Sequence, residues 1–146
     1  MEQHDEIFRD RLKELMEINE KTVKDISENT GISGASIYGY LSGLHLPNTE
    51  IAIRIADYFL CPLDFLFGLC NDFIQKERRI VSDITTRLKA AFDSCGKTRY
   101  RISKETRFSE GRLYRWYHGK VVPSIYNLVK LVEPLNCSLD FLVGRE

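Results

Sequence analysis

The chain has 146 residues, of which 43% are hydrophobic, and its 21 basic and 21 acidic side chains give a formal net charge of zero. This length suits one ordinary domain or two small ones with their own cores. No apolar run reaches membrane-spanning length, the N-terminus lacks the regions of a signal peptide, and the four cysteines and three histidines have no zinc-site spacing. We therefore expect a cytoplasmic protein with reduced thiols, no membrane association and no cofactor.

The zero net charge hides a division between the two halves of the chain. Residues 1–75 hold 6 Lys/Arg and 13 Asp/Glu, whereas residues 76–146 hold 15 Lys/Arg and 8 Asp/Glu. An excess of positive charge in one half is typical of proteins with a polyanionic partner. The second half is therefore the expected site for such a partner.

The first part of the chain predicts five helices and no strand, because its apolar residues recur at helical spacing and nowhere alternate. Phe8, Leu12 and Leu15 define a first helix over roughly residues 5–18. Serine, threonine and asparagine are preferred N-caps, and glycine commonly ends a helix. On these signals the later helices start at Thr22, at Ser33, at Asn48 or Thr49, and near Pro62, and the third ends at Gly43.

The segment that follows, residues 71–82, has the sequence NDFIQKERRIVS and contains neither glycine nor proline. Ile80, Val81 and Ile84 extend the helical spacing of the next apolar stripe backwards. We therefore predict a helical linker, with a helix that starts near Asn71 and can run to about Asp93, unless Ser82 caps a new helix. The domains are then residues 1–70 and 83–146.

The second part of the chain repeats the first with an offset of 76 residues. Residues 8–68 align with residues 84–144 without a gap, and 18 of the 61 positions are identical. This self-similarity predicts a tandem duplication and the same five helices again. Identical pairs include Arg11/Arg87, Thr22/Thr98, Ser33/Ser109, Tyr38/Tyr114, Gly43/Gly119 and the LDFL segments at 63–66 and 139–142. We expect both tyrosines to pack at the edge of the core.

Both copies share the pattern T-x-x-x-I-S-x-x-T-x-x-S-x-x-x-[IL]-Y-x-x-x-x-G-x-x-x-P, followed by LDFL. Each copy resembles a Cro/C1-type (XRE family) helix-turn-helix domain. The resemblance implies an all-α fold of two tandem, five-helix, lambda-repressor-like domains that bind double-stranded DNA. It also implies that the third helix of each copy enters the major groove.

The resemblance assigns DNA-facing positions in each copy. Base-facing positions are Gly34, Ala35 and Gly39 in the first copy and Glu110, Gly111 and Arg115 in the second. Phosphate-facing positions include Val23, Ser36 and Ser42 in the first copy and Arg99, Arg112 and His118 in the second. Lys97, Ser109 and Lys120 complete the expected DNA-binding set of the second copy.

These two sets differ in what they can recognise. Arg115 can hold guanine O6 and N7 with two bonds and Glu110 can accept from cytosine N4, whereas glycine and alanine offer only a methyl contact. Residues 97–120 also carry eight Lys/Arg against two Asp/Glu, while residues 21–44 carry two of each. Counterion release therefore favours the second copy as the DNA-binding one.

One departure from the family is shared by both copies. Related domains pair an arginine late in the first helix with a glutamate near the end of the third. Here the aligned positions hold Met16 and Leu41, and Phe92 and Tyr117. Because packed apolar groups can replace a buried ion pair without loss of stability, we predict that Met16 contacts Leu41 and Phe92 contacts Tyr117.

Three functional hypotheses follow from the sequence. The first is a sequence-specific transcriptional regulator, a homodimer that reads DNA through its second copy while the acidic first copy dimerises or binds a protein partner. The second is a covalent pseudo-dimer with both copies on one duplex. The third is a protein-interaction module, such as an antagonist of another regulator. No nucleophile–base pair or phosphate loop points to an enzyme.

Overall fold

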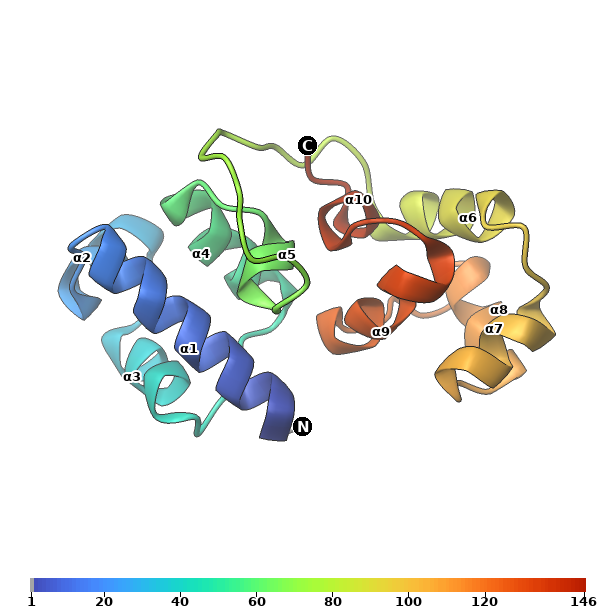
Figure 1. Cartoon of the computed structure of the whole chain (residues 1–146), viewed down its shortest axis with the longest axis horizontal. Coiled ribbons are helices and arrows are strands. Elements are labelled where there is room, and N and C mark those ends of the chain that lie inside the picture. The colour runs from blue at the N-terminus through green and yellow to red at the C-terminus, as the bar shows by residue number, and fades with distance from the viewer. Residues whose placement is uncertain (1) are drawn as a thin grey trace. The chain divides into compact units, whose positions relative to one another are not determined.

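The computed structural model describes residues 2–146, with side chains from Glu6 onward. It divides into two compact units, Met1–Arg78 and Arg79–Glu146. The described residues form ten helices and no strand, so the predicted all-α fold is confirmed (Figure 1). None of these helices is long and apolar enough to cross a membrane.

The first unit contains α1 (Glu2–Ile18), α2 (Val23–Thr30), α3 (Gly34–Ser42), α4 (Thr49–Phe59) and α5 (Leu63–Leu66). The predicted caps Thr22 and Ser33 are confirmed, because their side chains accept hydrogen bonds from the backbone N–H groups of Asp25 and Ser36. Asn48, not Thr49, caps α4. Gly31 and Gly43 end α2 and α3 in the left-handed conformation, with φ of 78° and 77°.

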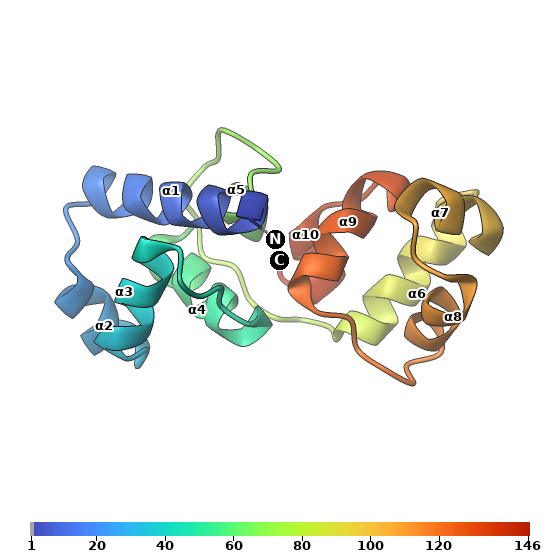
Figure 2. The ribbon, with the colours of Figure 1, turned by 90° about the horizontal axis from the view of Figure 1, so that it is seen from below.

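The core of the first unit holds α3 in place. Helix α1 packs against α3 and α5, and α2 packs against α3 and α4 (Figure 2). Phe8 of α1 is fully buried, and its ring centroid lies 6.0 Å from that of Tyr40 on α3 and 5.6 Å from that of Phe67. With Ile37 and Tyr40 facing this core, the opposite face of α3 is left toward solvent.

The second unit contains α6 (Ile84–Ser94), α7 (Arg99–Thr106), α8 (Glu110–Tyr117), α9 (Ile125–Leu135) and α10 (Leu139–Val143). Helices α7 to α10 each begin 76 residues after α2 to α5. Helix α6 packs against α8 and α10, and α7 packs against α8 and α9, which are the pairings of the first unit. Both units therefore have the same order and pairing of helices.

Equivalent side chains also make equivalent contacts in the two units. The guanidinium carbon Cζ of Arg11 lies 4.4 Å from the ring centroid of Phe65, and that of Arg87 lies 4.6 Å from the ring centroid of Phe141. In the second unit, Phe92 and Tyr117 meet edge to face with ring centroids 6.0 Å apart, which confirms their predicted contact. Met16 and Leu41 are both half-buried, and their contact stays a prediction.

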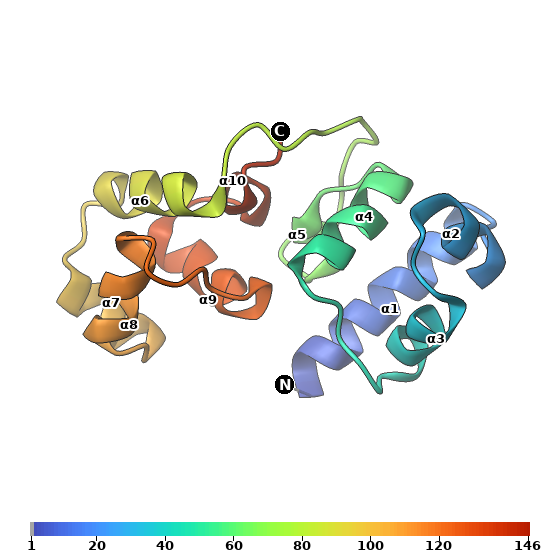
Figure 3. The same ribbon diagram turned by 180° about the vertical axis from the view of Figure 1, so that it is seen from behind.

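The prediction of a helical linker over residues 71–82 is wrong. This segment has no helical turn (Figure 3), and α6 begins at Ile84 with Asp83 as its N-cap, not Ser82. The backbone of this segment bonds to residues distant in the sequence instead of forming the bonds of a helix. Lys76 N–H donates to the carbonyl of Leu60 at 3.2 Å, and Arg79 and Glu146 exchange backbone hydrogen bonds of 2.6 and 2.8 Å.

These bonds divide the predicted linker between the two units. Residues up to Arg78 belong to the first unit and residues from Arg79 belong to the second. In the second unit, Val81 N–H also donates to the carbonyl of Gly144 at 2.7 Å, and Ile80 forms an antiparallel bridge with Arg145. We call residues 79–82 the strap, because this extended segment is tied to the end of α10.

Candidate nucleic-acid interface

The turn between α7 and α8 fixes the exposed face of α8. Arg107 ends α7 in the left-handed conformation, with φ of 68°, and Ser109 caps α8 by accepting from Arg112 N–H at 3.2 Å. The Ser103 hydroxyl donates to the carbonyl of Phe108 at 2.6 Å and ties α7 to the turn. Because Leu113 and Trp116 face the core, the predicted base-facing residues Glu110, Gly111 and Arg115 all lie on the exposed side.

Arg115 and Glu110 are both available to a ligand. Among the described residues, no hydrogen bond or ion pair involves the side chain of either one. A Cβ atom on Gly111 would lie 3.4 Å from Nη1 of Arg115, so the arginine side chain passes over this glycine toward the start of α8. Gly111 therefore leaves room for the guanidinium of Arg115.

Two other cations of the interface are held against aromatic rings. The guanidinium carbon of Arg112 lies 5.1 Å from the ring centroid of Phe108 and 5.0 Å from that of Trp116. The guanidinium carbon of Arg99 lies 5.0 Å from the ring centroid of Tyr114, whose ring lies 4.2 Å from that of His118. Such stacking restricts the rotamers of these cations while they remain exposed.

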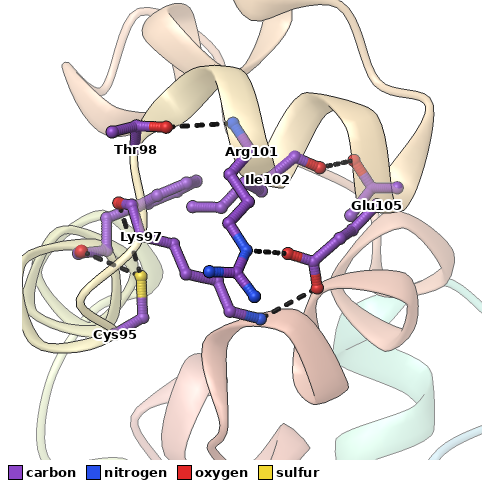
Figure 4. A network of polar contacts seen from close by, with 8 residues as sticks. Cys95, Lys97, Thr98, Arg101, Ile102 and Glu105 are labelled. Carbon is purple, nitrogen blue, oxygen red and sulfur yellow. Dashed lines mark hydrogen bonds and ion pairs between the residues drawn. The ribbon is translucent and has the colours of Figure 1, made fainter.

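Lys97 is less available than the sequence suggested. Its Nζ lies 2.9 Å from Oε1 of Glu105, whose other oxygen accepts from Nε of Arg101 at 3.2 Å (Figure 4). The hydrogen bond from Lys97 is the main cause that lowers the pKa of the Glu105 carboxyl group. Glu105 thus neutralises part of the positive charge around α7, whereas Lys120, near the end of α8, is exposed.

A hollow of about 250 Å³ lies at the start of α7, lined by Phe92, Asp93, Lys97, Arg99 and Tyr117. The hydroxyl of Tyr117 donates to Oδ1 of Asp93 at 2.8 Å, and this bond is the main cause that raises the pKa of the tyrosine. Arg99, at the N-terminus of α7, suits an anionic group such as a DNA phosphate, whereas Glu105 holds Lys97 and Asp93 adds a negative charge to the hollow.

The equivalent face of the first unit is uncharged. Ala35 is exposed, and Gly34 is half-buried with its Cβ position 3.8 Å from Cγ1 of Val23. The hydroxyls of Ser36 and Ser42 form local bonds, to the Ser33 hydroxyl at 2.9 Å and to the Gly39 carbonyl at 3.1 Å. No charged side chain belongs to α3 itself.

Two features of this face differ from what the sequence led us to expect. Tyr38 is 63% exposed, so its predicted packing at the core edge is wrong, whereas Tyr114 is 44% exposed and packs against the ring of His118. Gly39 is buried because the imidazole ring of His45 lies where its Cβ would be. No sequence signal marks His45, because its position depends on how the loop after α3 folds back.

The described residues contain no cluster of three or more His, Cys, Asp or Glu that could hold a metal ion. Residues 12–66 match the family model described as Helix-turn-helix, a segment that runs from α1 to the end of α5 in the first unit. No curated protein and no solved structure matches the chain. The family match supports a DNA-binding helix-turn-helix domain of the Cro/C1 type, and residues 79–146 lie outside it.

Proposed function

We propose that the protein is a sequence-specific transcriptional regulator that reads the major groove mainly through α8. The observation that carries this proposal is the exposed face of α8, which presents the side chains of both Arg115 and Glu110 without a partner among the described residues. An arginine in this position can hold guanine and a carboxylate can select cytosine. The stacked cations Arg99 and Arg112 flank this face and suit phosphate contacts.

In this proposal the first unit has a different task. It is acidic, and its α3 carries no charged side chain, so DNA attracts it weakly. We assign it to dimerisation or to a protein partner. A homodimer would place two α8 helices on half-sites about 34 Å apart, which raises affinity beyond that of one recognition helix.

A second candidate function is that of a pseudo-dimer, in which both units of one chain contact the same duplex. The family match favours this candidate, because the matched residues 12–66 lie in the first unit, which would then also bind DNA. The matching order and main pairings of the helices in the two units also support it. Under this reading the operator holds two different half-sites, because the two recognition faces differ in chemistry.

The test is DNA binding by the intact chain with and without Arg115. Selection from random duplexes first identifies a preferred site, and titrations then compare wild type with Arg115→Ala on that site and on random DNA. We expect Arg115→Ala to lose about 1–3 kcal/mol on the preferred site, roughly 5- to 150-fold in affinity, with a much smaller loss on random DNA. Equal affinity of wild type and variant for the preferred site would reject α8 as the reader.

The choice of variants follows from the contacts. Arg112 is a poor test residue because its guanidinium covers Phe108 and Trp116, so its removal also exposes the core. Arg54→Ala is the matched control, since Arg54 is an exposed arginine on α4 that pairs with Glu50 at 2.6 Å. Light scattering of the free protein and the number of chains bound per duplex then separate the homodimer from the pseudo-dimer.

A further inference from the structure

The recognition helices of the two units differ at one aligned position in an unexpected way. Position 115 of α8 holds an exposed arginine, while the aligned position 39 of α3 holds a buried glycine. The burial comes from His45, which follows α3 in the loop. Position 121, which aligns with His45 in the second unit, is a valine. The second unit therefore carries its polar side chain, Arg115, on the recognition helix, whereas the first unit carries His45 on the loop after the helix.

The loop after α3 is folded back onto the helix by specific bonds. Gly43 adopts the left-handed conformation with φ of 77°, and the backbone N–H groups of Leu44 and His45 both donate to the carbonyl of Gly39, at 2.9 and 3.3 Å. These bonds hold the backbone of His45 beside Gly39. The imidazole ring then covers the glycine, and any side chain at position 39 would displace it.

The orientation of the ring follows from its closest atoms. Measured from the Cβ position of Gly39, Cδ2 is nearest, and Cγ and Nε2 follow at 3.2 and 3.3 Å. The ring therefore meets α3 by its Cδ2 edge and turns the edge with Nδ1 and Cε1 away from the helix. His45 is exposed, and its ring occupies the space that a side chain at position 39 would fill.

We propose that His45 is a specificity-determining residue of the first unit, whose imidazole reads a base edge in the major groove in place of the side chain that Gly39 lacks. This inference rests on the second candidate function, the pseudo-dimer in which both units contact one duplex. A neutral imidazole offers one N–H donor and one acceptor. The imidazole donor suits the N7 and O6 acceptors of guanine. The exposed methyl group of Ala35, on α3, suits the methyl group of thymine.

The experiment is sequence selection from random duplexes by the intact chain, followed by competition titrations. The variants are His45→Ala, Gly39→Ala and Arg115→Ala, with Leu44→Ala as matched control because Leu44 is exposed in the same loop. We expect wild type to select two blocks of sequence. His45→Ala should lose about 3- to 10-fold discrimination at one position of one block and leave the other unchanged, while Arg115→Ala should do the reverse.

Gly39→Ala tests the geometry without removing the imidazole, because its methyl group would push His45 from its place. It should relax the same position as His45→Ala, whereas Leu44→Ala should relax none. His45→Gln keeps a donor and an acceptor, so it should keep a base preference at that position, and loss of all preference there would count against the inference. Thermal unfolding of each variant ensures that a comparison is made between folded proteins.

The outcomes separate this inference from the proposed function. If wild type selects two blocks and His45→Ala changes neither, the inference is overturned while the reading by Arg115 stands. A single selected block that depends on Arg115 alone also overturns it, since the first unit then reads no bases. If wild type selects no sequence at all, the proposed function fails and the inference fails with it.

Discussion

Arg107 and Gly31 occupy the same place in the turns between the helices of the two units, and both are left-handed, with φ of 68° and 78°. Glycine adopts this conformation freely, whereas the Cβ of an arginine makes it unfavourable by about 1–2 kcal/mol. The second unit therefore keeps a strained residue where the first does not. What the strained residue adds is an exposed cation just before α8.

Replacement of Arg107 by glycine should separate its two effects. We expect Arg107→Gly to raise the free energy of unfolding of the second unit by about 1 kcal/mol, because the strain is relieved. It should also weaken DNA binding through the loss of one cation. Denaturant unfolding and DNA titration measure the two changes. The reciprocal variant Gly31→Arg should destabilise the first unit by a similar amount, and a neutral effect of both variants would contradict the strain.

A second residue-scale feature is the ion pair of Asp140 and Arg145. Arg145 is 2% exposed, and its Nη1 lies 2.9 Å from Oδ1 of Asp140. The first unit has Leu69 at the position aligned with Arg145. Leu69 is 39% exposed, so the first unit does not bury this position as the second unit does.

Breaking this ion pair should be far more harmful than replacing it. Asp140→Ala leaves the arginine buried beside an apolar side chain, so we expect a loss of about 3–5 kcal/mol in the free energy of unfolding. The double variant Asp140→Leu with Arg145→Met removes both charges and should recover most of that loss. A double-mutant cycle in urea measures the coupling. Equal stability of the single and double variants would show that the pair is not coupled.

At the scale of elements, the helices could be predicted because their signals are local. Thr22, Ser33 and Ser109 cap helices by bonding a backbone group three residues away, which a sequence pattern captures. The predicted helix over residues 71–82 is wrong because the backbone of this segment bonds to Leu60 and Glu146, which lie far away in the chain. Helical spacing does not outweigh such partners in a short segment that has little to pack against.

In the candidate site, too, the local features were predictable and the long-range contacts were not. The exposed face of α8 follows from helical periodicity, so the places of Glu110 and Arg115 were predictable. The ion pair of Lys97 with Glu105 and the cover of His45 over Gly39 were not. Both depend on where a side chain from another segment ends, which no spacing rule describes.

The strap of residues 79–82 gives a prediction at this scale. Gly144 has φ of 78°, and a Cβ there would overlap the backbone carbonyl of Ser82 in the strap. Gly144→Ala should therefore detach the strap from α10 and lower the stability of the second unit by more than the usual cost of about 1–2 kcal/mol for a left-handed residue.

Gly96→Ala is the matched control for the strap, because Gly96 has φ of 72° and open space around its Cβ position. Thermal unfolding should show the larger loss for Gly144→Ala. Hydrogen exchange at the Val81 amide, which donates to the Gly144 carbonyl, should accelerate in that variant alone. Equal losses for the two glycines would mean that the strap moves aside without cost.

At the scale of the whole molecule, charge follows the boundary between the units. Residues 1–78 hold 8 Lys/Arg and 14 Asp/Glu, and residues 79–146 hold 13 and 7. The neutral chain is thus built from two units with net charges of −6 and +6. Because DNA binding responds to local and not to total charge, the salt dependence of binding should report which unit contacts the phosphates.

Each phosphate contact contributes about −0.9 to the slope of log affinity against log salt concentration. Replacement of Arg99, Arg107 and Lys120 by glutamine should therefore reduce the magnitude of this slope by about 2 to 3. The matched control replaces three exposed lysines of the first unit, Lys13, Lys21 and Lys24, and should leave the slope unchanged if only the second unit binds. Titrations of the intact chain over roughly 50 to 200 mM salt measure both slopes. A similar reduction in both triple variants would instead place both units on the duplex, because a unit away from the phosphates releases no counterions.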